Sequence, residues 1–222
     1  MAAGVGILGG TFDPIHVAHL RVAEEVREAF GLAEVRFVPA AVPPHKQGAA
    51  VTSAAHRRRM VERAIADVPA FRLWAIELER EGPSYTVDTL RTLRAEVGAA
   101  CPIVFVLGRD QFAEFHSWRE PEVILSLCDL AVVTRPPALG HLELTDFPVV
   151  TRDLLCYDRG SDRFDHASGH WVKSLPVTPL AVTSTSIRAA VRAHRSIRFL
   201  VPEPVRQYIE AHRLYASEDG RR

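Results

Sequence analysis

Two histidines three residues apart follow a pair of glycines near the start of the chain, and no other stretch carries a stronger chemical signal. Residues 9–19 read GGTFDPIHVAH, after a short apolar run. This order predicts a strand, a turn without bulky side chains and the start of a helix. Glycines let a large ligand approach the main chain, and the first turn of a helix offers N–H groups at a positive dipole end. The stretch therefore predicts an anion-binding site.

The two imidazoles strengthen this interpretation, because residues i and i+3 of a helix share a face. His16 and His19 are expected to lie over the end of the sheet. Their helix face continues into the apolar stripe Leu20, Ala23, Val26 and Phe30. Protonated imidazoles at the positive end of a helix repel that end unless an anion lies there. The alternative is that both histidines only cap the helix.

A second pattern overlaps the first, because GVGILG at 4–9 matches the dinucleotide-binding fingerprint G-x-G-x-x-G. That fingerprint needs its glycines after the strand and an acidic residue closing the second strand. Here the glycines run through the predicted strand, and the second strand ends in Pro39. We interpret the match as a coincidence.

Four hydroxyl residues gather near the carboxyl end of the chain, where VTSTSIR at 182–188 opens a predicted helix. Capping needs only one of them. Arg188 then stands in the first helical turn, where its charge opposes the dipole at a cost of up to about 1 kcal/mol. A bound phosphate would remove this penalty.

Strand-like and helix-like segments alternate, which is typical of a parallel sheet covered on both faces. The predicted strands are 5–8, 35–38, 71–76, 103–107, 130–134 and 174–177. The predicted helices are 16–30, 54–67, 86–97, 121–127, 186–193 and 203–211. We expect an α/β fold with a doubly wound, Rossmann-like parallel sheet in the order 3-2-1-4-5, and a ligand beyond the carboxyl ends of its strands.

Every unusual polar cluster follows a predicted strand, so the clusters are expected to converge on one site. They are residues 9–19, 43–46, 84–86, 108–110 and 183–188. We expect one domain over 1–222, with a core at 1–180, a helical part at 181–214 and a frayed tail at 216–222. Residues 136–173 break the alternation and predict an irregular excursion or part of a subunit interface. We expect their histidines to be solvated rather than metal ligands; these are His141, His166 and His170.

Composition sets limits on the class of protein. The chain has 222 residues with 27 basic and 27 acidic side chains, so no overall charge attracts nucleic acid. Three scattered cysteines predict neither disulfides nor a zinc cluster. Since neither a signal peptide nor an apolar stretch of about 18 residues is evident, we expect a cytoplasmic protein without membrane contact.

The segment at 9–19 resembles the signature of HIGH-type nucleotidyltransferases, and its longer form resembles bacterial nicotinate-nucleotide adenylyltransferases in particular. The segment 182–188 is similar to the second signature of that family, and the resemblance covers nearly the whole chain, least at 136–173. One position departs, because this chain has Ala18 where the family usually has glycine.

The resemblance implies a binding site for ATP at the two signatures. Catalysis is assigned to His16, His19, Lys46 and Arg188, which would neutralise charge on the triphosphate. The implied ATP-binding residues are Gly9, Gly10, Thr11, Phe12, His16, His19, Gly108, Thr183, Ser184, Thr185, Ile187 and Arg188. The implied cofactor is Mg²⁺, bound mainly through the ATP phosphates, without metal-ligand residues from the protein.

The resemblance also implies a second site, for nicotinate mononucleotide. Its implied residues are Gly10, Asp13, His45, Lys46, Ser84, Tyr85, Thr86, Asp110 and Trp118. Backbone N–H groups of the Ser84–Thr86 turn would bind the nicotinate carboxylate, Trp118 would stack on the ring, and Asp110 would contact the ribose.

The implied reaction is adenylyl transfer from ATP to nicotinate mononucleotide, in a monomer or a homodimer that binds no nucleic acid. One alternative is a relative that uses nicotinamide mononucleotide, phosphopantetheine or, with CTP, glycerol phosphate as the acceptor. Another is a sensor that binds ATP without turnover. A fragment of a tRNA synthetase is disfavoured, because the chain leaves no room for an anticodon-reading domain.

Overall fold

Eight strands form one sheet in a computed structural model that describes residues 4–41, 51–80, 82–134 and 141–216. The strand order is β3-β2-β1-β4-β5-β8-β7-β6. The strands are β1 (Val5–Gly10), β2 (Glu34–Pro39), β3 (Phe71–Leu73), β4 (Ile103–Gly108), β5 (Asp129–Thr134), β6 (Leu155–Asp158), β7 (Arg163–His166) and β8 (Trp171–Pro176). The pairings from β3 through β8 are parallel, whereas β7 and β6 join antiparallel at the outer edge.

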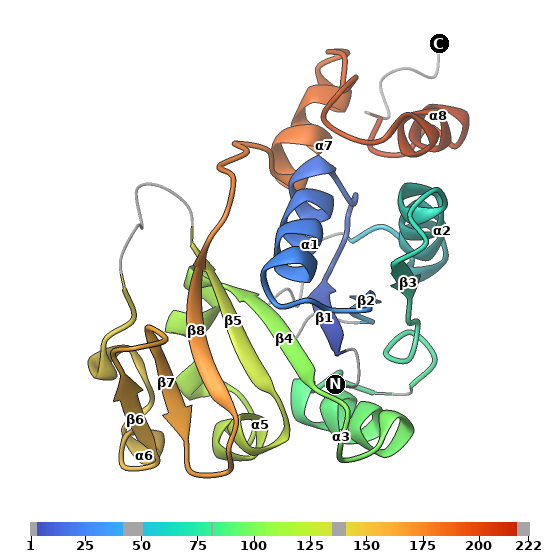
Figure 1. Ribbon diagram of the computed structural model, residues 1–222. Coiled ribbons are helices and arrows are strands. Elements are labelled where there is room, and N and C mark those ends of the chain that lie inside the picture. Colours follow the sequence, from blue (N-terminus) through green and yellow to red (C-terminus); the bar gives the residue numbers. More distant parts are fainter. Residues whose placement is uncertain (1–3, 42–50, 81, 135–140, 217–222) are drawn as a thin grey trace.

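Helices cover both faces of this sheet (Figure 1). One face carries α1 (Val17–Ala29), α2 (Ala54–Ile65), α7 (Ser184–Arg192) and α8 (Glu203–Ala211), which share one buried cluster with the sheet. The other face carries α3 (Thr86–Val97), α4 (Arg109–Ala113) and α5 (Pro121–Leu127), which share a second cluster. Short elements complete the described chain: η2 (Phe115–Ser117), η3 (Leu144–Asp146) and α6 (Val149–Arg152).

The predicted doubly wound α/β fold is confirmed, including the order 3-2-1-4-5 for the first five strands. Helices α3, α5 and α8 have the predicted bounds, because their start and stop signals are strong. Gly98 ends α3 with a φ of 81°, a left-handed conformation that favours glycine. Pro121 starts α5, where its fixed φ suits the first helical turn.

Two element boundaries near the predicted site differ from expectation. Strand β1 runs on to Gly10 rather than ending at Leu8, because its pairing with β2 continues to the register Gly10–Pro39. Helix α7 begins at Ser184 rather than Ser186, because the Thr183 hydroxyl accepts the Ser186 N–H and caps the helix. Strand β3 is also shorter than predicted and ends at Leu73.

The prediction that residues 136–173 are irregular is wrong for the part that the structure describes. It contains η3, α6, β6, β7 and the start of β8. In β7 the residues alternate between half-buried and buried, which is the two-residue period of a strand, but four residues give only a weak signal in sequence.

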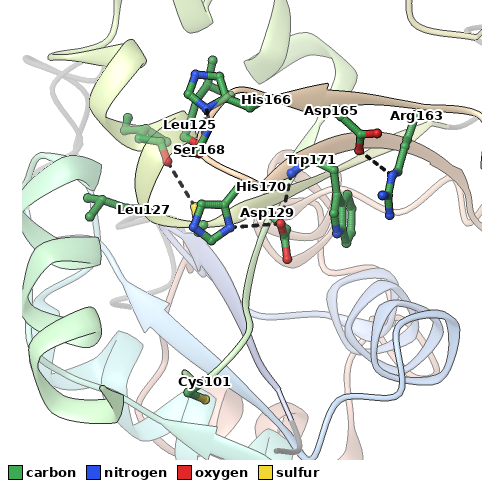
Figure 2. A network of polar contacts seen from close by, with 12 residues as sticks. Cys101, Leu125, Leu127, Asp129, Arg163, Asp165, His166, Ser168, His170 and Trp171 are labelled. Atoms are coloured by element: carbon green, nitrogen blue, oxygen red, sulfur yellow. Dashed lines mark hydrogen bonds and ion pairs between the residues drawn. The ribbon is translucent and has the colours of Figure 1, made fainter. Parts of the chain in front are cut away.

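Two of the three histidines of this region, His166 and His170, are not simply solvated. His166 is 8% exposed, and its Nδ1 lies 2.7 Å from the Ser168 hydroxyl. His170 pairs with Asp129 at 3.1 Å, and Asp129 also accepts the Trp171 N–H (Figure 2). The side chain of His141 is 80% exposed, as predicted, although its ring also pairs with Asp162. The contacts of His170 and Trp171 with Asp129 fasten the β7–β8 turn to the start of β5.

In the described part of the chain, no helix is both long and apolar enough to cross a membrane.

Candidate active site

A cavity of about 270 Å³ lies at the point where the strand order reverses between β1 and β4. Gly9, Gly10 and Thr11 at the end of β1 form part of its wall. The start of α3 and the residues after η2 form another part, with Ser84, Tyr85, Thr86 and Trp118 among the lining residues. The cavity thus brings together two of the five sequence clusters that were expected to converge, 9–19 and 84–86.

The wall at α3 presents the start of a helix. Tyr85 is the N-cap residue of α3 and has no side-chain capping bond, so the proposed capping by Ser84 or Thr86 is not observed. The first N–H groups of a helix have no acceptor within it. The start of α3 therefore offers the cavity backbone donors and a positive dipole end.

Trp118 supplies an aromatic wall. Its ring lies against Phe115 and Phe105, with centroids 5.5 and 6.1 Å apart, and it also lines the cavity. Tyr85 lines the same space, and the Arg119 guanidinium lies 4.8 Å from its ring centroid. A flat apolar ring could enter between such groups.

The histidine pair lies on α1, at the other side of the β1 end. His16 is the N-cap of α1, and its ring stacks on that of His19 with centroids 3.7 Å apart. The His16 N–H donates to His19 Nδ1 at 3.3 Å, so in the neutral ring the proton is on Nε2. Phe12, 2% exposed, contacts the His19 ring edge-on. The alternative that the histidines only cap the helix therefore accounts for one nitrogen of His19, Nδ1. Phe12 packs against the same ring from the core.

The two segments that resemble the family signatures, 9–19 and 182–188, contact each other directly. Arg188 and Asp13 are 175 positions apart in the sequence. Arg188 Nη1 donates to the Asp13 carbonyl at 2.6 Å, and the Ser184 hydroxyl donates to the Pro14 carbonyl at 2.9 Å. Thr178, in the connection from β8 to α7, donates its N–H to Glu25 of α1 at 2.8 Å. Helix α7 thus presents Arg188 beside the turn that carries the histidines.

Arg57 of α2, which is 1% exposed, also holds the turn that follows β1. Its guanidinium donates to four backbone carbonyls, those of Thr11, Ala40, Ala41 and Thr52, at 2.7–3.1 Å. Burial lowers the pKa of Arg57, but arginine remains charged under ordinary conditions. This one side chain therefore joins the ends of β1 and β2 to the start of α2.

Asp13 is part of this support. It is 4% exposed, and its carboxylate accepts the Thr52 N–H at 3.3 Å and the Tyr215 O–H at 2.7 Å. Burial and the neighbouring Asp13 raise the pKa of Tyr215, so the phenol stays a donor. Asp13, proposed from sequence as a ligand of the mononucleotide, thus has two partners within the protein and is absent from the described lining of the cavity.

Replacing Tyr215 by phenylalanine is expected to lower the free energy of unfolding by about 1.5–3 kcal/mol, the usual contribution of a hydrogen bond to a charged group. Denaturant unfolding followed by circular dichroism measures this change. Tyr157→Phe is a matched control, because its O–H also donates to an aspartate, Asp162, but on the exposed surface. An equal loss in both variants would contradict the importance of burial.

Comparison with known proteins now separates the possible families. A cytidylyltransferase-like match spans residues 7–190. A relative from Geobacter metallireducens, named probable nicotinate-nucleotide adenylyltransferase, is 46% identical over 96% of this chain and 98% of its own length. The chain belongs to the nicotinate-nucleotide adenylyltransferase family.

Further similarities agree with this family. A Pseudomonas aeruginosa relative with the same name is 43% identical over 98% of this chain and 99% of its own. Among solved structures, a Plasmodium falciparum nicotinic acid mononucleotide adenylyltransferase complexed with NaAD shares the fold, with a TM-score of 0.69 and 20% identity. That similarity covers 96% of this chain and 97% of the other.

Several residues that the family resemblance assigned to ligands have other surroundings here. Ile187 is fully buried in the core, so only its backbone is available to a ligand. Gly108 is the N-cap of α4, and exposed Asp110 follows in the first helical turn instead of capping it. Thr183 caps α7, and Thr185 accepts from Arg188. His45 and Lys46 lie outside the described residues.

Sequence reasoning missed five polar residues that line the cavity, which are Glu77, Thr89, Gln111, Ser117 and Arg119. Gln111 belongs to no motif in the sequence. In the structure its amide oxygen accepts the Gly108 N–H across a single turn of α4. Glu77 and Arg119 lie in charged surface-like stretches of sequence. Only the folded chain shows that they face the same space.

Proposed function

We propose that this chain transfers the adenylyl group of ATP to nicotinate mononucleotide, giving deamido-NAD and pyrophosphate. The observation that supports this best is that the end of β1 lies between the cavity on one side and the histidine pair with Arg188 on the other. Gly9, Gly10 and Thr11 line the cavity, while the following residues of the same turn contact Arg188 and lead into the histidine pair. The close relatives carry the name of this activity over almost their whole length.

The cavity suits the mononucleotide ring. Its volume of about 270 Å³ is slightly below the range typical of drug-sized ligands, so it fits a ring with its sugar rather than a whole dinucleotide. Trp118 would stack on the ring, and the backbone N–H groups at Tyr85 and Thr86 would bind the ring carboxylate. The start of α3 favours a negative charge there.

The triphosphate would then lie over the first turn of α1, between His16, His19 and Arg188. A phosphate oxygen of the mononucleotide attacks the α-phosphorus of ATP, and the bond from that phosphorus to the β-phosphate oxygen breaks. Because the attacking phosphate is ionised near neutral pH, no general base is required. The protein contributes position and positive charge where negative charge develops on the leaving pyrophosphate.

We further propose that Mg²⁺ accompanies ATP and is held mainly by phosphate oxygens, as is usual for this ion at nucleotide sites. The donor set agrees with this role, since the carboxylate of the turn, Asp13, already accepts from Thr52 and Tyr215. When bound, Mg²⁺ would neutralise part of the charge on the triphosphate.

Pyrophosphate release from ATP, measured across a panel of acceptors, tests the proposed function. The panel contains nicotinate mononucleotide, nicotinamide mononucleotide and phosphopantetheine, plus glycerol phosphate with CTP, each with and without Mg²⁺. We expect the highest kcat/KM with nicotinate mononucleotide and Mg²⁺. Turnover with phosphopantetheine alone would contradict the proposal, and ATP binding without turnover of any acceptor would support a sensor instead.

A further inference from the structure

A carboxyl group lines the cavity in which the nicotinate ring is proposed to bind. Among the described lining residues, Glu77 is the one acidic side chain, and Arg119 is the one cationic side chain. The family resemblance assigned neither of them a role. A half-buried acid is an unexpected neighbour for a substrate that carries a carboxylate of its own, because two like charges repel strongly at short range.

Glu77 is held in place by α3. The hydroxyl of Thr89, which is 3% exposed, donates to Glu77 Oε1 at 2.8 Å. Burial raises the pKa of Glu77, while the bond from Thr89, the charge of Arg80 and the Ser84 side chain oppose this rise. The neutral form of Glu77 therefore persists to a higher pH than that of an ordinary glutamic acid.

The charged groups around Glu77 change the balance between its neutral and ionised forms only a little. Arg80, in the same connection between β3 and α3, is the cation that acts on it. Arg119, from the segment after η2, has Asp88 and Glu120 within 3.8 and 3.4 Å. On the α2 side, Arg58 is shared between Glu62 and Glu79. The lining residues from β1, β2 and β4 carry no charge.

We propose that Glu77 is a specificity-determining residue whose protonation state selects between a carboxylate and a carboxamide on the ring of the acceptor nucleotide. In the neutral form, its O–H donates a hydrogen bond to the ring carboxylate of nicotinate mononucleotide. In the ionised form, it repels that carboxylate and accepts an N–H of nicotinamide instead. Binding of nicotinate mononucleotide then takes up one proton from solvent whenever free Glu77 is ionised.

This inference rests on the proposed function, and its test separates the two. The quantity to measure is the ratio of kcat/KM for nicotinate mononucleotide to that for nicotinamide mononucleotide, from about pH 5 to pH 8. Both nucleotides carry the same phosphate, so its titration cancels in the ratio. We expect the ratio to fall as pH rises, by an overall factor on the order of ten to a hundred, as expected for two like charges in close proximity.

Glu77→Gln is the decisive variant, because the amide keeps an oxygen for Thr89 and offers a permanent N–H donor to the cavity. In this variant the ratio is expected to be independent of pH and to favour nicotinate throughout. Glu79→Gln is the matched control, because Glu79 is 63% exposed and is not among the described lining residues. Its ratio is expected to follow that of the unchanged protein.

A second measurement does not depend on any variant. Calorimetry of nicotinate mononucleotide binding in buffers of different ionisation enthalpy is expected to show proton uptake at pH 7.5, whereas nicotinamide mononucleotide shows less. A ratio with the same pH dependence in Glu77→Gln as in the unchanged protein would overturn the role of Glu77 and leave the proposed function intact. Absence of turnover with either nucleotide would instead contradict the proposed function.

Discussion

Arg188→Ala is expected to lower kcat/KM for pyrophosphate release by about 10²–10³-fold, the usual cost of removing one donor that stabilises developing charge. Arg188 lies in the second turn of α7, because the helix starts at Ser184, and Nη1 donates to the Asp13 carbonyl at 2.6 Å. The guanidinium is therefore held at the boundary between the two signature segments. His19→Ala is expected to act in the same range, because its ring lies on the other side of the proposed triphosphate. Steady-state kinetics with saturating acceptor measures both changes.

The matched control is Arg192→Ala, which removes the same charge from the exposed last turn of α7. Its kcat/KM is expected to change less than threefold, because salt screens the effect of a charge on the exposed surface. Circular dichroism of all three variants checks that the fold survives. Nearly unchanged turnover in Arg188→Ala would contradict the assignment of this residue to the site.

Arg57→Met is expected to lower the free energy of unfolding by about 3–5 kcal/mol, the range observed when one partner of a buried charged contact is removed. Methionine fills much of the volume but donates no hydrogen bond. The carbonyls of Thr11, Ala40, Ala41 and Thr52 would each lose the donor that Arg57 supplies. Denaturant unfolding at equilibrium measures the change, with nucleotide left out to avoid linkage.

The neighbouring Arg58→Met serves as its control. Arg58 lies on the exposed face of α2, and its side chain is 47% accessible in its pairs with Glu62 and Glu79. Exposed ion pairs contribute little to stability. A loss in Arg57→Met no larger than that in Arg58→Met would show that water replaces the buried donor without cost.

Much of the fold could be predicted from sequence because its signals are local. The apolar stripe of α3 and the glycine after it predict that helix to the residue. The sheet order follows from the alternation of elements and the handedness of their crossovers. By contrast, β6 and β7 are strands of four residues at a sheet edge, too short for a clear pattern in sequence. The contact of His170 with Asp129, which fastens the turn after β7 to β5, is likewise not encoded by a local pattern.

The residues of the site also fall into two groups, those that a local sequence pattern indicates and those that depend on partners distant in sequence. Motif spacing indicated the histidine pair and Arg188, and the structure places the turn at Asp13 in contact with Arg188. The supporting shell was not predictable, because the partners of Asp13 and Thr11 are Tyr215 and Arg57, which are 202 and 46 positions away. The cavity residue Glu77 was missed for the same reason.

The contact between Tyr215 and Asp13 has a consequence for synthesis of the protein on the ribosome. The first strand and its histidines emerge early, whereas the phenol that bonds to Asp13 emerges some two hundred residues later. Contacts this distant in sequence form late. A nascent chain would therefore lack this support of the turn at Asp13 until residue 215 has left the exit tunnel.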